Sequence, residues 1–213
     1  MLVAIAGLIG AGKSTLCDGL EGIKFYEPVE SNPYLNDFYA NPKEHCFAMQ
    51  IHLLAERFRM VNKAYWMQVT DPVNTVTILD RSIFEDWVFA RLGMLNGNMS
   101  ELNFKTYESL HETMQSFLTL PDLVLYIEAP IDTVMDHIAK RSRTCECGIP
   151  REYLEDLQKG YDVLIPLLER KCRVVHLDGT KSAEEVLKDA NDAIEKRKAE
   201  LRDEPHPHYK GGL

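Results

Sequence analysis

The sequence predicts an α/β fold in which a five-stranded parallel sheet is covered by helices on both faces. Along the 213 residues, five short apolar runs alternate with segments of helical periodicity. A glycine-rich stretch at residues 7–14 directly follows the first of these runs, residues 2–6. Strands that alternate with helices are typically joined by crossover connections, and crossovers keep neighbouring strands parallel.

The predicted elements differ in the spacing of their apolar residues. The strands are short and rich in apolar or β-branched residues, and they are residues 2–6, 24–27, 73–79, 123–127 and 173–177. The helices carry apolar residues three and four positions apart, and they are residues 15–21, 43–67, 83–95, 104–118, 131–140, 151–169 and 183–201. Residues 32–42 are expected to form a loop or a short helix.

Length and composition predict one domain and limit the classes of partner. We expect a single domain over residues 1–202 and a flexible C-terminal tail at 203–213, where apolar periodicity is lacking. The net charge of −9 argues against a nucleic-acid partner and against a membrane surface. No apolar run has the length of a membrane-spanning helix. The five cysteines are odd in number and scattered, which indicates free thiols and a cytoplasmic location.

Residues 7–14 read Gly-Leu-Ile-Gly-Ala-Gly-Lys-Ser and fit the phosphate-loop pattern G-x4-G-K-[ST]. Glycines let successive backbone N–H groups turn inward around phosphate oxygens. Lys13 is expected to reach the β and γ phosphates of ATP or another nucleoside triphosphate, and Ser14 to ligate Mg²⁺. The predicted nucleotide-binding residues of this loop are Gly7, Gly10, Ala11, Gly12, Lys13, Ser14 and Thr15.

Charged residues follow two other predicted strands. Glu27 closes the second strand at its carboxyl end, where open parallel sheets place their ligands. Asp80 and Arg81 follow the third strand, where Asp80 could help hold Mg²⁺ and Arg81 could neutralise a transferring phosphate. The alternatives are a solvated acid at Glu27 and, at Asp80 and Arg81, a helix-start ion pair with no chemistry.

Two further pairs of polar residues have suggestive spacing. Gln50 and Arg57 lie seven positions apart in the long predicted helix, so they project from about the same face, two turns from each other. Each could equally be a plain surface residue. Arg141 and Arg143 stand at a helix-to-loop junction, a position typical of a mobile lid that closes over phosphates.

These motifs together resemble the deoxyribonucleoside kinase family, which includes deoxycytidine, deoxyguanosine and deoxyadenosine kinases. The resemblance runs from Met1 to about Asp178, with motifs in family order, and it rests on residues 7–14, Glu27-Pro28-Val29, Asp80-Arg81-Ser82, Arg141-Ser142-Arg143, Glu146 and Tyr153-Leu154. It implies a P-loop kinase fold with a short arginine lid. It further implies Mg²⁺-dependent transfer of a γ-phosphoryl group to the 5′-hydroxyl of a deoxyribonucleoside, and usually a homodimer packed through helices.

The resemblance also implies roles at the reacting end of the site. Glu27 matches the general base that accepts the 5′-hydroxyl proton, and Arg81 matches the residue that holds this hydroxyl and the incoming phosphate. Asp80 stands near the expected Mg²⁺. Arg141 and Arg143 match the lid arginines, whereas His137 stands where the family often has Arg or Lys.

Further matching residues surround the sugar and the base. Tyr39 and Glu146 match the pair that binds the sugar 3′-hydroxyl, and a buried tyrosine there leaves little room for a 2′-hydroxyl. Gln50, Arg57 and Asp86 match the residues that read the base. Their mixture of donors and acceptors favours a purine deoxynucleoside, with deoxycytidine possible and thymidine poor.

Two other functions remain open at this point. A nucleoside monophosphate kinase of the thymidylate kinase type shares a phosphate loop and an Asp-Arg strand end, but its acceptor is already a phosphate and needs no general base at Glu27. A non-catalytic P-loop module would bind nucleotide without phosphorylating a small molecule. Such a module would not need Glu27, Gln50, Arg57 and Asp86 together.

Overall fold

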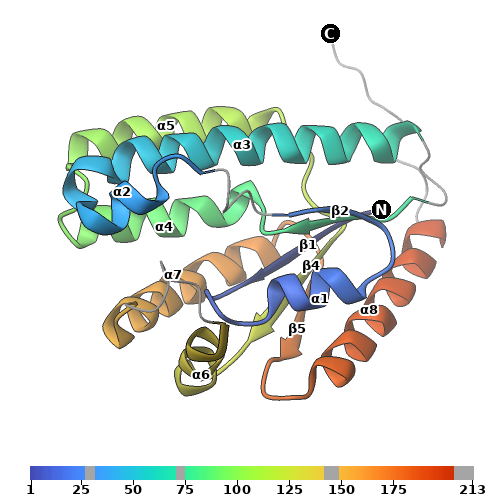
Figure 1. Cartoon of the computed structure of the whole chain (residues 1–213). Coiled ribbons are helices and arrows are strands. Elements are labelled where there is room, and N and C mark those ends of the chain that lie inside the picture. Colours follow the sequence, from blue (N-terminus) through green and yellow to red (C-terminus); the bar gives the residue numbers. More distant parts are fainter. Residues whose placement is uncertain (27–31, 71–74, 142–148, 204–213) are drawn as a thin grey trace, which may run out of the picture.

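The computed structural model describes residues 1–26, 32–70, 75–141 and 149–203, apart from the side chains of Arg141 and Asp203. Five strands form one sheet in the order β2-β3-β1-β4-β5, and every pair is parallel (Figure 1). The strands are β1 (Leu2–Gly7), β2 (Ile23–Phe25), β3 (Thr77–Asp80), β4 (Leu123–Glu128) and β5 (Val174–Asp178). The predicted fold class is confirmed.

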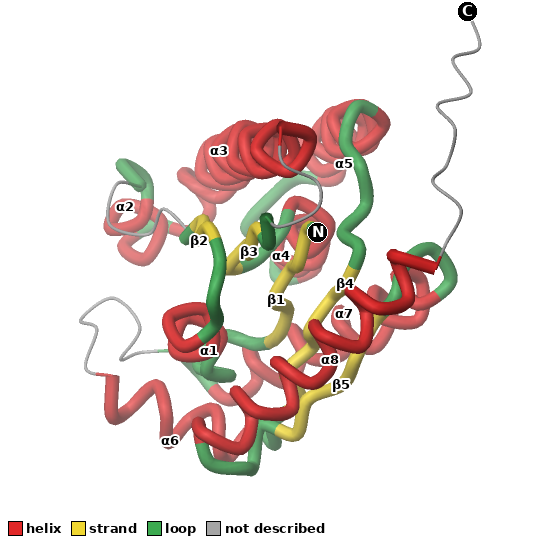
Figure 2. Tube along the Cα trace, turned by 90° about the vertical axis from the view of Figure 1, so that its right-hand side faces the viewer, coloured by secondary structure: helices red, strands yellow, loops and turns green. Residues whose placement is uncertain are grey.

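Helices cover both faces of the sheet. One face packs against α1 and α8, and the other packs against α3 and α7, with α4 between these two helices and α5 beside α3 and α4 (Figure 2). The helices are α1 (Lys13–Gly19), α2 (Leu35–Ala40), α3 (Pro42–Thr70), α4 (Ile83–Leu95), α5 (Glu101–Ser116), α6 (Ile131–Arg141), α7 (Arg151–Glu169) and α8 (Ala183–Asp203). Within the described ranges, no helix is both long and apolar enough to cross a bilayer.

The central strands β1, β3 and β4 are buried along almost their whole length. This explains why their sequences are continuous apolar runs rather than alternating patterns, because a parallel sheet with helices on both sides has no face toward water. The edge strands β2 and β5 are partly exposed. Their apolar signal is correspondingly weaker.

The boundaries of several predicted elements were wrong. The second strand ends at Phe25, and Glu27 lies outside the described residues. The third strand begins at Thr77, later than the apolar run at residues 73–79 predicts, and extends to Asp80. Helix α5 begins three residues earlier than predicted, because the Ser100 hydroxyl caps it by accepting a hydrogen bond from the Asn103 N–H at 3.1 Å. Helix α8 extends to Asp203, where the predicted tail begins, and residues 204–213 lie outside the described part.

Gly10 allows the phosphate loop to pack against α6. Its φ of +80° lies in the left-handed region, and a Cβ at this position would lie 2.7 Å from Ile138 Cγ1 and 2.9 Å from the Val134 carbonyl oxygen. Gly97 has a similar φ of +68°, but a Cβ there would meet no atom within 4 Å. Comparing substitutions at the two glycines therefore distinguishes the destabilisation caused by a left-handed backbone from the destabilisation caused by close packing.

Replacing Gly10 with alanine should destabilise the protein by about 1–3 kcal/mol more than replacing Gly97, because only Gly10 adds an overpacked contact. In a chain of this size, each kcal/mol lowers Tm by about 2–4 °C. Thermal denaturation of Gly10→Ala and Gly97→Ala measures the difference. Equal Tm values for the two variants would contradict the close packing of α6 on the loop.

Candidate active site

A cavity of about 1040 Å³ lies at the carboxyl ends of β1 and β3. The phosphate loop, α2, α3, α4 and α6 contribute side chains to its wall, as do residues that follow β5. Most predicted site residues that the structure describes line this cavity, namely Gly10, Ala11, Gly12, Lys13, Ser14, Thr15, Tyr39, Gln50, Arg57, Asp80, Arg81 and Asp86. The parallel topology brings them together because ligands of such sheets bind beyond the carboxyl ends of the strands.

The phosphate loop has the features of an anion site. Helix α1 begins at Lys13 with Gly12 as its N-cap in a left-handed conformation, and its first turn contains no acidic residue. The helix dipole and the backbone N–H groups of this terminus favour negative charge. Lys13 is buried, and its Nζ donates a hydrogen bond to the Leu8 carbonyl oxygen at 2.5 Å. The ammonium group is therefore held inside the loop at the place where phosphates would lie.

Gly7 was predicted to bind nucleotide, but it is not among the residues that line the cavity. Its backbone faces the protein interior instead. The Tyr161 hydroxyl donates to the Gly7 carbonyl oxygen at 3.0 Å, and the Gly7 N–H donates to Glu85 Oε2 at 3.4 Å. The N–H of Gly7 belongs to the end of β1, before the loop turns, and nucleotide binding by Gly7 stays a prediction.

Ser14 and Asp80 meet across the cavity. The Ser14 hydroxyl donates to Asp80 Oδ2 at 2.7 Å, and Asp80 is buried at the end of β3. The other carboxylate oxygen, Oδ1, is buried and has no hydrogen-bond partner among the described residues. A buried carboxylate oxygen needs a partner, and Mg²⁺ takes oxygen ligands. These two residues fit the Mg²⁺ site that the sequence predicts.

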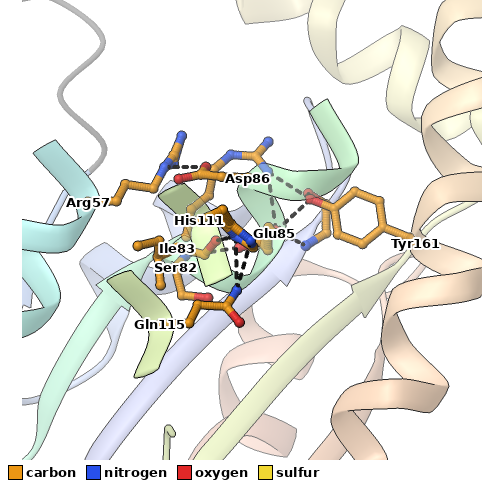
Figure 3. A network of polar contacts seen from close by, with 10 residues as sticks. Arg57, Ser82, Ile83, Glu85, Asp86, His111, Gln115 and Tyr161 are labelled. Carbon is orange, nitrogen blue, oxygen red and sulfur yellow. Dashed lines mark hydrogen bonds and ion pairs between the residues drawn. The ribbon is translucent and has the colours of Figure 1, made fainter. Parts of the chain in front are cut away.

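Arg81 follows Asp80 at the end of β3, and its guanidinium group contacts buried residues of α4 and α7. Nη1 lies 3.3 Å from Glu85 Oε2 and 2.8 Å from the Tyr161 hydroxyl. Figure 3 shows Glu85 and Tyr161 close to each other below Asp86. Arg81 therefore forms an ion pair with Glu85 in the first turn of α4, as the alternative of a helix-start ion pair expects, and its contact with a phosphate stays a prediction.

Gln50 and Arg57 from α3 and Asp86 from α4 also line the cavity, and all three are buried. Arg57 Nε lies 2.8 Å from Asp86 Oδ1, and each side chain is only 2% exposed (Figure 3). Gln50 is also buried, and its Oε1 has no hydrogen-bond partner within the described part of the chain. The prediction that Gln50 and Arg57 share one face of the long helix is confirmed, because both line the same cavity from α3.

The remaining predicted site residues are Tyr39, at the rim of the cavity, and four residues whose side chains are not described. Tyr39 lines the cavity, but it is 40% exposed, so the expectation of a buried tyrosine is wrong. The short helix α2 carries it at the rim and buries none of its residues. Glu27, Arg143 and Glu146 lie outside the described residues, and Arg141 ends α6 with a side chain that is not described.

Sequence reasoning noted His137 only as a departure from the family pattern, and it missed Lys181 in the cavity wall and the buried residues Glu85 and Tyr161 behind Arg81. His137 lines the cavity, and its Nδ1 lies 2.9 Å from the Gly10 carbonyl oxygen, so Nδ1 is the donor. Lys181 also lines the cavity three residues after the end of β5. Its position beyond a strand end was the signal that could have identified it. Glu85 and Tyr161 had no such signal, because helical periodicity alone assigns Tyr161 to the core.

Comparisons with known proteins agree with this arrangement. The family model described as "Deoxynucleoside kinase" matches residues 3–201. A deoxyadenosine kinase of Dictyostelium discoideum is 33% identical over 180 residues, which cover 83% of this chain and 71% of the relative. A deoxyadenosine/deoxycytidine kinase of Bacillus subtilis (strain 168) is 34% identical over 168 residues, 76% of this chain and 75% of the relative.

A solved structure also resembles this chain in fold and in sequence. The deoxyadenosine kinase from M. mycoides with bound dATP superposes with a TM-score of 0.79 at 28% sequence identity, covering 92% of this chain and 100% of that chain. The resemblance found in the sequence motifs is confirmed by the family model, by relatives more than 30% identical and by this fold. The chain belongs to the deoxynucleoside kinase family.

Proposed function

We propose that the protein transfers the γ-phosphoryl group of ATP, or of another nucleoside triphosphate, to the 5′-hydroxyl of a purine deoxyribonucleoside. The observation that carries this proposal is the single cavity that joins an anion site at Lys13 to the buried polar cluster of Gln50, Arg57 and Asp86. The first would bind the donor phosphates and the second the acceptor base. Family membership supports a nucleoside acceptor over the two alternative functions.

In the proposed mechanism, the nucleoside oxygen attacks the γ-phosphorus and the nucleoside diphosphate leaves in line. Glu27 accepts the proton of the 5′-hydroxyl, which makes the oxygen a better nucleophile. Lys13 holds the β and γ phosphates, and Arg81 balances the charge where the acceptor meets the γ group. Arg141 and Arg143 would close over the phosphates from the end of α6.

Ser14 and Asp80 would hold Mg²⁺, since their oxygens lie 2.7 Å apart and Asp80 Oδ1 is buried without a partner in the described residues. When bound, the ion neutralises charge on the donor phosphates. Ser14 contributes a hydroxyl oxygen at the start of α1, and Asp80 keeps its carboxylate at the end of β3.

The base preference follows from hydrogen-bonding capacity. Gln50 offers a donor and an acceptor, Arg57 offers only donors and ionised Asp86 offers only acceptors. Adenine and guanine present N7 as an acceptor beside an exocyclic amino group or a carbonyl, and cytosine presents N3 beside its amino group. Thymine would set its methyl group against the Arg57–Asp86 pair. The names of the relatives, deoxyadenosine and deoxyguanosine kinases among them, support a purine.

Tyr39 and Glu146 are proposed to bind the sugar 3′-hydroxyl, so deoxyribonucleosides should be preferred over ribonucleosides. One assay tests the whole proposal: the protein is incubated with ATP, Mg²⁺ and a panel of deoxyadenosine, deoxyguanosine, deoxycytidine, thymidine, adenosine and nucleoside monophosphates. Phosphorylation of purine deoxynucleosides, lost on addition of EDTA, is the expected result. Phosphorylation of monophosphates alone, or equal rates with adenosine and deoxyadenosine, would contradict the proposal.

Replacing Asp86 with alanine should change base preference and stability together. The ratio of kcat/KM for thymidine to that for deoxyadenosine should rise by about tenfold or more, the discrimination that a pocket exerts over one methyl group. Removing the carboxylate 2.8 Å from the buried Arg57 should also destabilise the fold by about 3–5 kcal/mol. Steady-state kinetics and thermal denaturation measure the two effects, and Asp86→Asn is the control that keeps the side-chain shape. Thymidine as the best substrate of the wild type would contradict the base assignment.

We also propose a homodimer packed through helices and a location in the cytosol. The exposed apolar side chains Leu95 and Leu102 on α4 and α5, and Phe117 directly after α5, support a helical interface. The described cysteines Cys17, Cys46 and Cys172 carry free thiols, which suits a reducing compartment. Light scattering coupled to gel filtration gives the oligomeric state, and a monomer at micromolar concentration would reject the dimer.

A further inference from the structure

We propose that Tyr161, together with Glu85, is a positioning residue for phosphoryl transfer, holding the Arg81 guanidinium and the first residue of the phosphate loop in one buried network. This inference rests on the proposed function, in which Arg81 contacts the transferring phosphate. Tyr161 lies on α7 and Glu85 on α4, and both side chains are fully buried (Figure 3). Neither residue lines the cavity, so any effect on the reaction has to pass through a neighbour.

Arg81 needs to be held in place. Its φ of +71° lies in the left-handed region, and it is the only non-glycine residue with positive φ in the described ranges. Such a conformation costs about 1–2 kcal/mol for a residue with a side chain, so surrounding contacts must maintain it. Its guanidinium group contacts Glu85 and the Tyr161 hydroxyl and lies 4.9 Å from the centre of the Phe89 ring. These contacts fix where the positive charge lies.

The Tyr161 hydroxyl is the shared point of the network. It accepts a hydrogen bond from Arg81 Nη1 at 2.8 Å, and its own proton lies between Glu85 Oε2 at 2.5 Å and the Gly7 carbonyl oxygen at 3.0 Å. Burial and the Glu85 carboxylate both raise the pKa of Tyr161 well above its usual value, so the hydroxyl keeps this proton. One hydroxyl therefore connects the end of β1 with the residue that follows β3.

Glu85 has partners at both of its oxygens. Oε1 accepts from the Ser82 N–H at 3.1 Å in the capping box that starts α4, and Oε2 accepts from Arg81, Tyr161 and the Gly7 N–H. A fully buried carboxylate is costly unless it is paired and hydrogen-bonded. Glu85 is therefore held in place by residues at the carboxyl ends of β1 and β3 and by the N-cap of its own helix, α4.

The close packing of α7 on α4 places the Tyr161 hydroxyl beside Arg81 and Glu85. Gly160 precedes Tyr161, and a Cβ at Gly160 would lie 2.3 Å from Val88 Cγ1, so a glycine is required for α7 to approach α4 this closely. Glycine inside a helix costs about 1 kcal/mol relative to alanine. The Tyr161 ring also stacks on Tyr126 of β4, with ring centres 5.8 Å apart. The ring and its hydroxyl are therefore held by contacts on two sides.

The test compares two buried tyrosines that stack on each other. Tyr161→Phe removes the hydroxyl that binds Arg81, and Tyr126→Phe removes a hydroxyl whose hydrogen bond, at 3.1 Å, comes from Gln158. Because a hydrogen bond to a charged group is involved, Tyr161→Phe should lower kcat by about 10–100-fold, with the nucleoside KM changed less than about threefold. Tyr126→Phe should keep kcat within about twofold of wild type, and thermal denaturation shows whether both variants are folded.

A double-mutant cycle shows whether Tyr161 acts through Arg81. In an Arg81→Lys background, where the planar guanidinium group is absent, Tyr161→Phe should lower kcat by less than about threefold further. If Tyr161→Phe does not fold, Glu85→Gln provides the same comparison, because it keeps the side-chain shape and removes the charge beside Arg81. A normal kcat in the folded variant, a loss equal to that of Tyr126→Phe or full additivity with Arg81→Lys would overturn the inference. An inactive wild type in the same assay would instead reject the proposed function.

Discussion

Replacing Lys13 with alanine should lower kcat for deoxyadenosine phosphorylation by about 10²–10³-fold. This is the loss that follows removal of one preorganised group that stabilises charge in the transition state. Lys13 Nζ is held at the Leu8 carbonyl inside the phosphate loop, so the charge is already in position before the donor binds. Steady-state assays with saturating ATP and Mg²⁺ measure the effect on kcat.

The control for this variant is Lys159→Ala. Lys159 is an exposed lysine of α7 whose ammonium group lies 2.7 Å from Asp156 Oδ1, so its removal should leave kcat unchanged. Thermal denaturation of both variants shows whether the fold is retained. A folded Lys13→Ala enzyme with normal turnover would remove Lys13 from the mechanism, even though it lines the cavity.

Replacing Glu27 with glutamine should lower kcat by about 10²–10⁴-fold, the contribution typical of a positioned general base. Glutamine keeps the size and hydrogen-bonding capacity of the side chain but cannot accept the 5′-hydroxyl proton. Nucleoside affinity should change far less, because binding does not require proton transfer. The measurement is a comparison of kcat from steady-state kinetics with nucleoside Kd from calorimetry.

Glu21→Gln is the matched control for the Glu27 variant. Glu21 is exposed and lies six positions earlier in the chain, so the same change of charge should leave turnover within about twofold of wild type. Near-normal turnover in Glu27→Gln would show that another group takes the proton. A parallel loss of affinity and turnover would point to a binding role instead.

Local sequence patterns predicted much of the site. The pattern of residues 7–14 located the loop that lines the cavity between β1 and α1, because a phosphate loop needs only a strand, glycines and a helix that are adjacent in the chain. The seven-residue spacing placed Gln50 and Arg57 on one helix face, and both line the cavity. Asp80 follows from its position at the end of an apolar run. Each of these inferences uses residues within a few turns of one another.

Other features depended on geometry that is not local. Tyr39 is exposed because α2 lies at the rim of the cavity. A helix of six residues is too short for the spacing of its apolar residues to predict this exposure. The start of β3 at Thr77 is set by pairing with β1, where Leu2 lies opposite Thr77, rather than by the apolar run alone. Burial of the Arg57–Asp86 pair required two helices, α3 and α4, to pack together.

The sequence by itself therefore determined the fold class, the phosphate loop and the polar helix face, because short-range spacing fixes which side chains share a face or a turn. Only the tertiary structure decided that the Arg81 guanidinium contacts Glu85 and Tyr161. Tyr161 lies 80 residues from Arg81 and 154 residues from Gly7, and a close approach at Gly160 brings them together. Hydrogen bonds across such separations depend on how whole helices pack on the sheet, which no local pattern records.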